Sequence, residues 1–139
     1  MAPAQPRPEG EAVSALRIVL PVPPNRGNDR SHWRKVAREK AAYYAAARVR
    51  ILQQTTVAQR AAGPDDHFVV SAALFVWNRF DDDGAVALLK WPIDALGYAR
   101  VLYQDKRPWC ALAGIPNQHI DRKSPHIVLL IEPLSPETT

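Results

Sequence analysis

The sequence predicts a single small domain of the α/β or α+β class, in which about four strands form one mixed sheet with two main helices packed on it. Short apolar runs alternate along the chain with longer segments of helical periodicity. The length of 139 residues favours one domain, and a hydrophobic content of 47% is enough for a core. A single cysteine, Cys110, excludes an intrachain disulfide framework and a cysteine-rich zinc site.

The two ends of the chain are expected to lie outside the folded domain, which spans residues 14–134. Residues 1–13 are rich in proline and polar side chains, and residues 135–139 are similar, so both are predicted to be disordered tails. The N-terminus lacks the apolar stretch of a secretory signal, and no segment approaches the length of a membrane span. We therefore expect a cytoplasmic protein with no membrane partner.

The first half of the domain is predicted to contain a strand followed by a long helix. Residues 16–20 (LRIVL) form the strand, and residues 21–28 form a loop because proline, glycine and asparagine are dense there. The helix begins near Ser31 and ends near Gln54. At about 100° per residue, its apolar face carries Trp33, Ala37, Tyr44, Ala47 and Ile51. We expect Trp33 to pack in the core.

The second half of the domain is predicted to contain further strands and one interrupted helix. Residues 67–77 form a largely buried strand, and helical periodicity extends from about residue 84 to residue 97. Pro92 lies within this stretch, so we expect a kink or a restart there. After a loop at residues 101–109, strands are expected near residues 110–115 and 126–132.

Three consecutive aspartates, Asp81, Asp82 and Asp83, come directly after the buried strand and before the helix. If the chain stays extended, Asp81 and Asp83 point to one side and Asp82 to the other. Carboxylates held close together raise each other's pKa unless a cation lies between them, and a hard divalent ion such as Mg²⁺ prefers oxygen ligands. The alternative is structural, because acidic residues before a helix often cap it and complement its dipole.

Two further residues are candidates for the same site. Lys90 follows Asp83 by two helical turns, so it lies on the same side as the start of the helix and is placed to support a phosphate or a leaving oxygen. Spacing alone favours the alternative, an ion pair between Lys90 and Asp94 at i+4. Asp105 lies in a loop beside two basic residues, where an aspartate is usually just solvated.

The motifs occur in a definite order along the chain. A Pro-Pro-Asn loop at residues 23–25 follows the first strand, and His-Trp-Arg at residues 32–34 opens the helix. The rest of the pattern is RFDDDG at residues 79–84, Lys90, DAL at residues 94–96 and QD at residues 104–105. In this order the motifs resemble the RusA family of Holliday junction resolvases, in the form common in phages and prophages. The resemblance covers nearly the whole predicted domain.

The resemblance implies an endonuclease that acts on branched DNA. It implies that Asp81, Asp83 and Asp105 bind Mg²⁺, or Mn²⁺ in its place, and that Lys90 is the essential lysine near the scissile phosphate. It also implies a homodimer that resolves four-way junctions by paired nicks in DNA recombination and repair. No nucleotide cofactor is implied, and the compartment is the cytoplasm of a bacterial host.

The sequence departs from the family pattern at two positions. Gly84 stands where the family usually has asparagine, which removes a cap or ligand and loosens the start of the helix. Gln104 stands where the family usually has the first aspartate of a pair, which removes a negative charge and lowers the expected metal affinity. Neither departure removes the three carboxylates or the lysine.

Basic and aromatic side chains near these motifs are candidates for DNA contact, and a net charge of +4 is compatible with a polyanionic partner. The candidates are Arg26, Arg30, His32, Arg34, Arg38, Arg79, Phe80, Lys106 and Arg107. The arginines from Arg26 to Arg38 form the best-placed stripe, although a charged helix face is more often merely solvated. Phe80 is a candidate wedge between base pairs, and core packing is an equal alternative.

Three alternatives to a junction resolvase remain open from the sequence. The first is a nuclease of the same architecture that acts on other branched DNA. The second is a catalytically weak or inactive protein that binds branched DNA, with Gly84 and Gln104 as signs of decay. The third is a structural protein in which the acidic run only caps a helix, and this alternative predicts that Asp105 lies far from Asp81.

Overall fold

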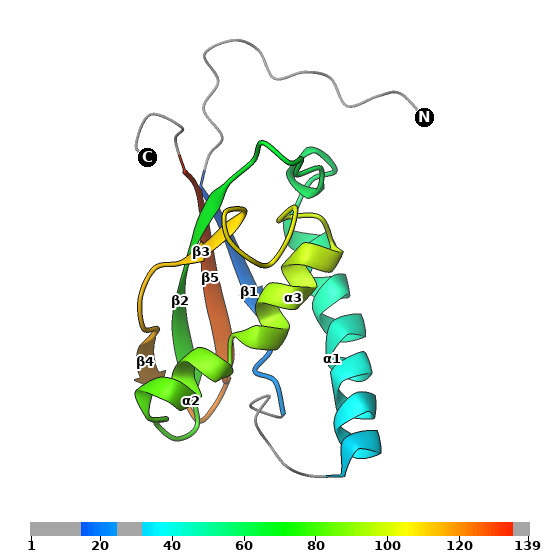
Figure 1. Cartoon of the computed structure of the whole chain (residues 1–139). Coiled ribbons are helices and arrows are strands. Elements are labelled where there is room, and N and C mark those ends of the chain that lie inside the picture. Colours follow the sequence, from blue (N-terminus) through cyan, green and yellow to red (C-terminus); the bar gives the residue numbers. More distant parts are fainter. Residues whose placement is uncertain (1–14, 25–31, 135–139) are drawn as a thin grey trace.

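The computed structural model describes residues 15–24 and 32–134 and contains one mixed sheet with its helices on one face (Figure 1). The strands are β1 (Leu16–Leu20), β2 (Phe68–Val76), β3 (Cys110–Leu112), β4 (Asn117–Ile120) and β5 (His126–Pro133). The helices are α1 (Trp33–Gln54), α2 (Asp82–Ala87) and α3 (Lys90–Tyr98), and a short 3-10 helix, η1 (Ala58–Arg60), follows α1. The predicted mixed α and β class is confirmed, with five strands in the sheet. The predicted tails, the helix start near Ser31, and Arg26 and Arg30 lie outside the described residues.

The sheet is mixed because it contains both antiparallel and parallel strand pairs. β5 lies between β1 and β2 and is antiparallel to both. The other edge of β2 is shared by two short parallel strands, with β3 along residues 68–70 and β4 along residues 73–76. Between them Gly114 has a φ of 81°, a left-handed conformation that suits glycine. β4 was not predicted, because its sequence NQHI is polar and lacks the apolar alternation of a buried strand.

The core lies between the sheet and the helices. Alternate strand residues point into it, and the fully buried ones are Ile18, Leu20, Val70, Leu74, Val76, Ile127, Leu129 and Ile131. The helical side and the segment after α3 contribute Ile51, Leu88, Leu89, Leu96 and Leu102. Burial of each such side chain contributes roughly 1.5–3 kcal/mol. Trp91 of α3 packs against Tyr43 of α1 with ring centroids 6.0 Å apart, so aromatic side chains join the two helices.

The long helix α1 ends at Gln54 as predicted, but its buried face differs from the predicted one. Tyr43, Ala47 and Ile51 are buried, whereas Trp33 is 70% exposed and Ala37 is exposed. The prediction that Trp33 packs in the core is therefore wrong. The physical reason is visible in Figure 1, where the first turns of α1 extend past the end of the sheet and have no strand to cover them.

The second helical stretch begins at Asp82, earlier than predicted, and is divided into α2 and α3. The interruption predicted at Pro92 falls a few residues before it, at Leu88 and Leu89. Pro92 itself lies in the first turn of α3, where a missing backbone N–H removes no intrahelical hydrogen bond. This break turns α3 away from α2 and aligns it beside α1 (Figure 1).

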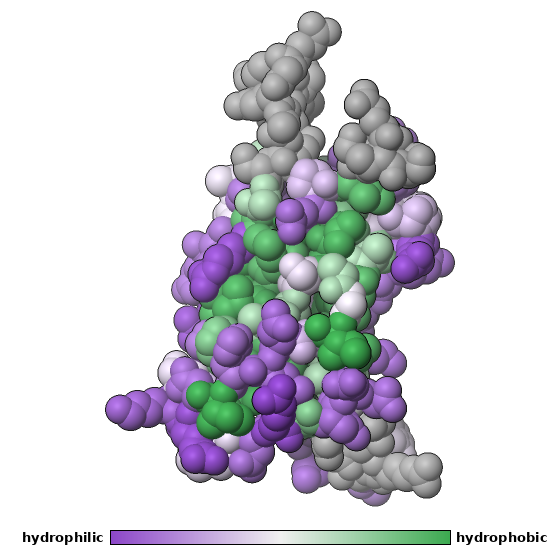
Figure 2. Space-filling view, turned by 90° about the vertical axis from the view of Figure 1, so that its left-hand side faces the viewer, coloured by the Kyte–Doolittle hydropathy of each residue, from purple (hydrophilic) through white to green (hydrophobic). Residues whose placement is uncertain are grey.

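The face of the sheet opposite the helices is apolar, and we call it the open face. Its half-buried side chains are Val19, Val69, Ser71, Ala73, Phe75, Val128 and Leu130. Figure 2 shows apolar side chains gathered in a band on this side of the molecule. The Phe75 ring is stacked between His119 and His126, at centroid distances of 4.8 and 4.4 Å. In the described part of the chain, no helix combines the length and the apolar character needed to cross a membrane.

Candidate functional site

The acidic run begins at Asp81, separated from the end of β2 by residues 77–80, and the segment that leads to it is held by β4. The side-chain amide of Gln118 accepts a hydrogen bond from the Phe80 N–H at 2.8 Å and donates one to the Phe80 carbonyl at 2.9 Å. This double contact works like a strand pairing and fixes the backbone one residue before Asp81. Phe80 is half-buried against the core, so the core-packing alternative describes its position in this structure.

Asp81 caps α2, which is the structural alternative for this residue. Its Oδ1 accepts a hydrogen bond from the Gly84 N–H at 2.7 Å. Asp82 and Asp83 lie in the first helical turn, where their charges complement the helix dipole, and all three aspartates are exposed. The expected alternation of Asp81 and Asp83 against Asp82 is wrong, because the chain is helical from Asp82 and not extended.

Gly84 fits the Asp81 cap closely. A Cβ atom at position 84 would lie 2.7 Å from Asp81 Oδ1, closer than real Cβ contacts come. The glycine that departs from the family pattern therefore allows the carboxylate to approach the backbone of α2. A side chain at position 84 would displace the Asp81 carboxylate from its capping position.

Asp105 lies at the other end of the helical segment and pairs with Asp94. The Cβ of Asp105 is 3.9 Å from the position that a Cβ of Gly97 would take, so the loop residue packs against the last turns of α3. The carboxyl groups of Asp94 and Asp105 share a hydrogen bond. The Tyr44 hydroxyl of α1 donates a second hydrogen bond, of 2.9 Å, to Asp94 Oδ2.

The paired carboxyls have pKa values that move in opposite directions. Burial, and then the hydrogen bond with Asp105, raise the pKa of Asp94 from 3.8 to about 6. The same hydrogen bond is the main cause that lowers the pKa of Asp105, and the nearby charges of Lys106 and Lys90 add to it. When the pair holds one proton, that proton therefore resides on Asp94, and Asp105 is the ionised partner.

Lys90 is the first residue of α3, and it is exposed. The alternative that it forms an ion pair with Asp94 is not observed, because the ion pair found in the described residues joins Lys35 and Glu39 at 3.9 Å. The positive charge of Lys90 instead helps to lower the pKa of Asp105. Of the causes that shift the pKa of Asp105, the Lys90 charge is the smallest, and the two side chains form no ion pair within the described residues, so a shared site stays a prediction.

The three predicted metal ligands are not gathered in the structure. Asp81 and Asp83 lie at the start of α2, and Asp105 packs against the far end of α3. Within residues 15–24 and 32–134, no three His, Cys, Asp or Glu side chains form a group that could hold a metal ion. Carboxylate oxygens are ligands that Mg²⁺ accepts, so the chemistry of Asp81, Asp83 and Asp105 suits such an ion, but their arrangement in this structure does not form its site. The metal site stays a prediction.

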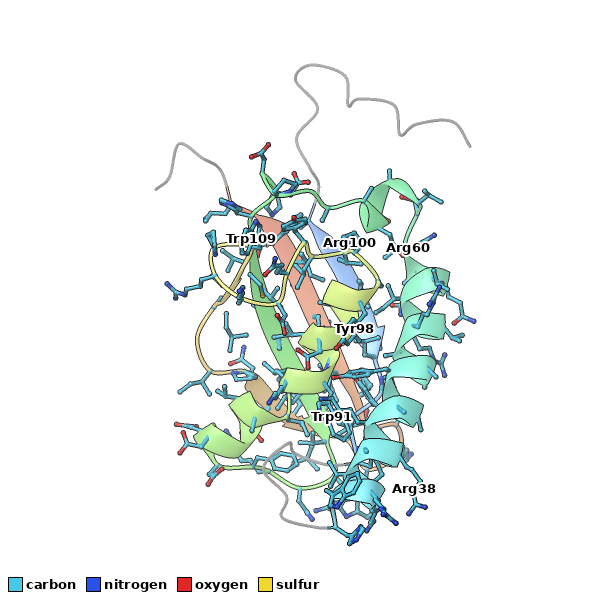
Figure 3. The ribbon with its side chains drawn as sticks, turned by 45° about the vertical axis from the view of Figure 1, so that its right-hand side comes forward. Arg38, Arg60, Trp91, Tyr98, Arg100 and Trp109 are labelled. Atoms are coloured by element: carbon cyan, nitrogen blue, oxygen red, sulfur yellow. The ribbon has the colours of Figure 1, made fainter. Side chains whose placement is uncertain are left out.

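The predicted DNA-contacting residues fall into separate regions. Arg34 and Arg38 are exposed on the first turns of α1, where Figure 3 shows Arg38. The Arg34 guanidinium lies over the Trp33 ring at 5.2 Å. His32 caps this helix, with its Nδ1 accepting from the Arg34 N–H at 3.3 Å. Arg79 is exposed and lines, with Phe80 and Asp81, a hollow of about 580 Å³ at the end of β2. Two exposed residues, Lys106 and Arg107, follow Asp105.

Neither a scan against protein-family models nor a search of curated proteins finds a match for this chain. The resemblance to the RusA family therefore rests on the ordered motifs alone, and the activity it implies stays a prediction. Sequence reasoning missed the roles of Tyr44 and Asp94 in positioning Asp105. No local signal could have found the first contact, because Tyr44 and Asp94 are 50 positions apart and meet only when α1 packs on α3.

Proposed function

We propose that this protein is a Mg²⁺-dependent, structure-selective endodeoxyribonuclease that resolves four-way DNA junctions by paired nicks. The observation that supports this function best is the pair of Asp105 and Asp94, which lines an open pocket of about 230 Å³. The pair offers an ionised carboxylate on a protein of net charge +4, and the charge of Lys90 is near enough to help lower the pKa of Asp105. The RusA-like order of motifs supplies the substrate class.

Asp105, Asp94 and Lys90 have distinct roles in this proposal. Asp105, with its lowered pKa, stays ionised and is available as an oxygen ligand or as an acceptor for a water proton. Asp94 holds Asp105 in place from α3, and Tyr44 holds Asp94 from α1. The Lys90 ammonium neutralises charge on the scissile phosphate or the leaving oxygen. Asp81, Asp83 and Asp105 are the residues that would hold Mg²⁺ or Mn²⁺, and the start of α2 would have to approach Asp105 for all three to bind one ion. Bound there, the ion would supply activation of water and stabilisation of charge that develops on the phosphate.

The basic side chains account for substrate affinity in this proposal. Arg34 and Arg38 on α1, and Lys106 and Arg107 beside Asp105, are exposed and free to contact phosphates. Such contacts release counterions, so binding should weaken steeply with added salt. Work in the cytoplasm of a bacterial host on junctions formed during recombination and repair is part of the same proposal.

The proposed homodimer needs a surface, and the open face of the sheet supplies one. With strands about 4.8 Å apart and a rise of about 3.4 Å per residue, the flat area of this face is roughly 500 Å². This value does not include the additional surface of its side chains. Stable dimers bury roughly 600–1,000 Å² on each partner, so two open faces packed together approach the size required. Half-buried Val19, Val128 and Leu130 would then be covered by the same residues of a second copy.

A second candidate function is a protein that binds branched DNA without cutting it. It is favoured by the Asp81 cap, which engages one of the three predicted ligands in holding α2. Incubation of a synthetic mobile four-way junction with the protein and Mg²⁺, alongside Asp83→Asn, separates the two functions. Paired symmetric nicks that disappear in the variant support the nuclease. Tight binding without nicks in either Mg²⁺ or Mn²⁺ supports the binding protein.

A further inference from the structure

Arg100 occupies a backbone position that favours glycine. It follows α3 with a φ of 61°, the one positive φ of a non-glycine residue in the described part of the chain. The Arg100 N–H bonds to the Gly97 carbonyl at 3.1 Å and the Val101 N–H to the Leu96 carbonyl at 3.0 Å, which is the hydrogen-bond pattern of a Schellman helix end. The helix end explains the positive φ of Arg100. Because such a position favours glycine, the helix end does not explain why an arginine is present.

The Arg100 side chain lies beside the candidate site. It lines the 230 Å³ pocket together with Asp94 and Asp105. Its guanidinium lies 5.5 Å from the centre of the Tyr103 ring and donates a long hydrogen bond, 3.4 Å, to the Tyr103 carbonyl. It is exposed and forms no ion pair with a described carboxylate. A cation of this kind keeps donors available for a phosphate.

Tyr98 presents an aromatic surface next to Arg100. It is 76% exposed at the end of α3, and the edge contact of its ring with Tyr44, at 5.2 Å, leaves most of the ring open. On one side lies the pocket with Arg100, and on the other a second hollow of about 340 Å³ that is lined by Tyr44, Arg48 and Ala95 among others. Figure 3 shows Tyr98 and Arg100 on the side of the molecule where α3 faces α1.

We propose that Tyr98 and Arg100 form a binding site for one unpaired nucleotide of DNA, next to Asp105. The base stacks on the Tyr98 ring, and the adjoining phosphate is held by the Arg100 guanidinium. An exposed ring between two hollows accepts the face of a base only when that face is not already stacked inside a duplex. This inference rests on the proposed function for its substrate, and it adds that the bound DNA has an unpaired nucleotide at this point.

The test is the affinity of the full chain for a labelled single-stranded oligothymidine, measured by fluorescence anisotropy in EDTA at fixed low salt. Arg100→Gly should weaken binding about 10-fold, because a phosphate contact is lost, while its Tm stays equal or rises. Tyr98→Ala should weaken binding by a similar factor. Arg122→Gly is the matched control, since Arg122 also lies over an aromatic ring, that of Trp77 at 5.7 Å, and it should bind like the wild type.

An abasic oligonucleotide separates base stacking from phosphate binding. The wild-type chain should bind it more weakly than oligothymidine, and Tyr98→Ala should bind both alike. The proposal is overturned if the wild type does not bind single strands, if Arg100→Gly binds as the wild type does, or if the wild type binds abasic and normal strands equally. Because EDTA removes divalent ions, the outcome does not depend on cleavage. If the chain binds single strands as expected but never cuts a junction, the proposed nuclease activity is contradicted and the proposed nucleotide-binding site is still supported.

Discussion

The Tyr44 hydroxyl donates a 2.9 Å hydrogen bond to Asp94 Oδ2, and this bond links α1 to α3 beside Asp105. Asp94 in turn shares a hydrogen bond with Asp105. The position of the loop carboxylate is therefore set by two helices that are distant in sequence. A change in Asp94 should therefore affect Asp105 directly, and a change in Tyr44 should affect it through Asp94.

Tyr44→Phe removes the hydroxyl and keeps the ring that packs against Trp91 and Tyr98. We expect a loss of about 1 kcal/mol in the free energy of unfolding, because a hydrogen bond to a partly buried carboxyl is removed. Urea denaturation measures this loss. Tyr98→Phe is the matched control, since its hydroxyl has no hydrogen-bond partner in the described chain, and an equal loss in both variants would count against the assigned contact.

Asp94→Asn should change how stability depends on pH. The folded-state pKa of Asp94 is about 6, above its usual 3.8, so between these values the folded state binds more protons than the unfolded state. Wild-type stability therefore falls as pH rises from about 4 to about 6, by on the order of 1–2 kcal/mol after allowance for partial exposure. The lowered pKa of Asp105 acts at more acidic pH, where stability is lost as pH falls.

The measurement is urea denaturation of the wild type and Asp94→Asn at a series of pH values between 4 and 7. The stability of the variant minus that of the wild type should rise across this window, since asparagine carries no proton to lose. Parallel curves for the two proteins would show that the pKa of Asp94 is not raised by folding.

Gly84→Ala should give little or no stabilisation, although alanine is usually the better helix residue by about 1 kcal/mol. The new Cβ displaces the Asp81 carboxylate, and loss of this cap offsets the gain. Gly97→Ala is the matched control, because its Cβ would make ordinary 3.9 Å contacts, and it should stabilise α3. In an Asp81→Ala background Gly84→Ala should also stabilise, and a thermal denaturation series that shows no such difference contradicts the account.

Val128→Lys should disrupt the proposed dimer, because it places a charge at the centre of the open face, opposite Val19 of the neighbouring strand β1. Light scattering after size exclusion should find a dimer for the wild type and a monomer for the variant. Val49→Lys, at a 53% exposed position of α1, should remain dimeric. A monomeric wild type, or a dimeric Val128→Lys, would remove the open face as the interface.

Much of the fold could be predicted from local pattern, because buried strands and a long amphipathic helix carry strong periodic signals. β1 and the C-terminal end of α1 were predicted at their observed residues, and β2 and β5 within one residue at each end. β4 was missed because its polar residues serve the position of Phe80 through Gln118 rather than the core. Trp33 was misplaced because a helical wheel does not show where the sheet ends.

The candidate site was predictable only in part. Asp105 and Lys90 were chosen from sequence, and the Lys90 charge is a small contribution to the lowered pKa of Asp105. The capping of α2 by Asp81 was one of two alternatives that the run left open, and it is observed. The partners of Asp105 were beyond local pattern, because they depend on how α1 and α3 pack. The identity of residue 100 carried no periodic signal, and only its φ draws attention to it.

The rate of nicking of a mobile four-way junction in Mg²⁺ tests the central claim most directly. The account predicts paired, symmetric nicks by the wild type, a rate lower by about 100-fold or more in Asp105→Asn, and an unchanged rate in Asp65→Asn, which alters an exposed aspartate in the turn before β2. Tight junction binding with no nicks by the wild type, in Mg²⁺ or Mn²⁺, or equal rates in Asp105→Asn and Asp65→Asn, would contradict it.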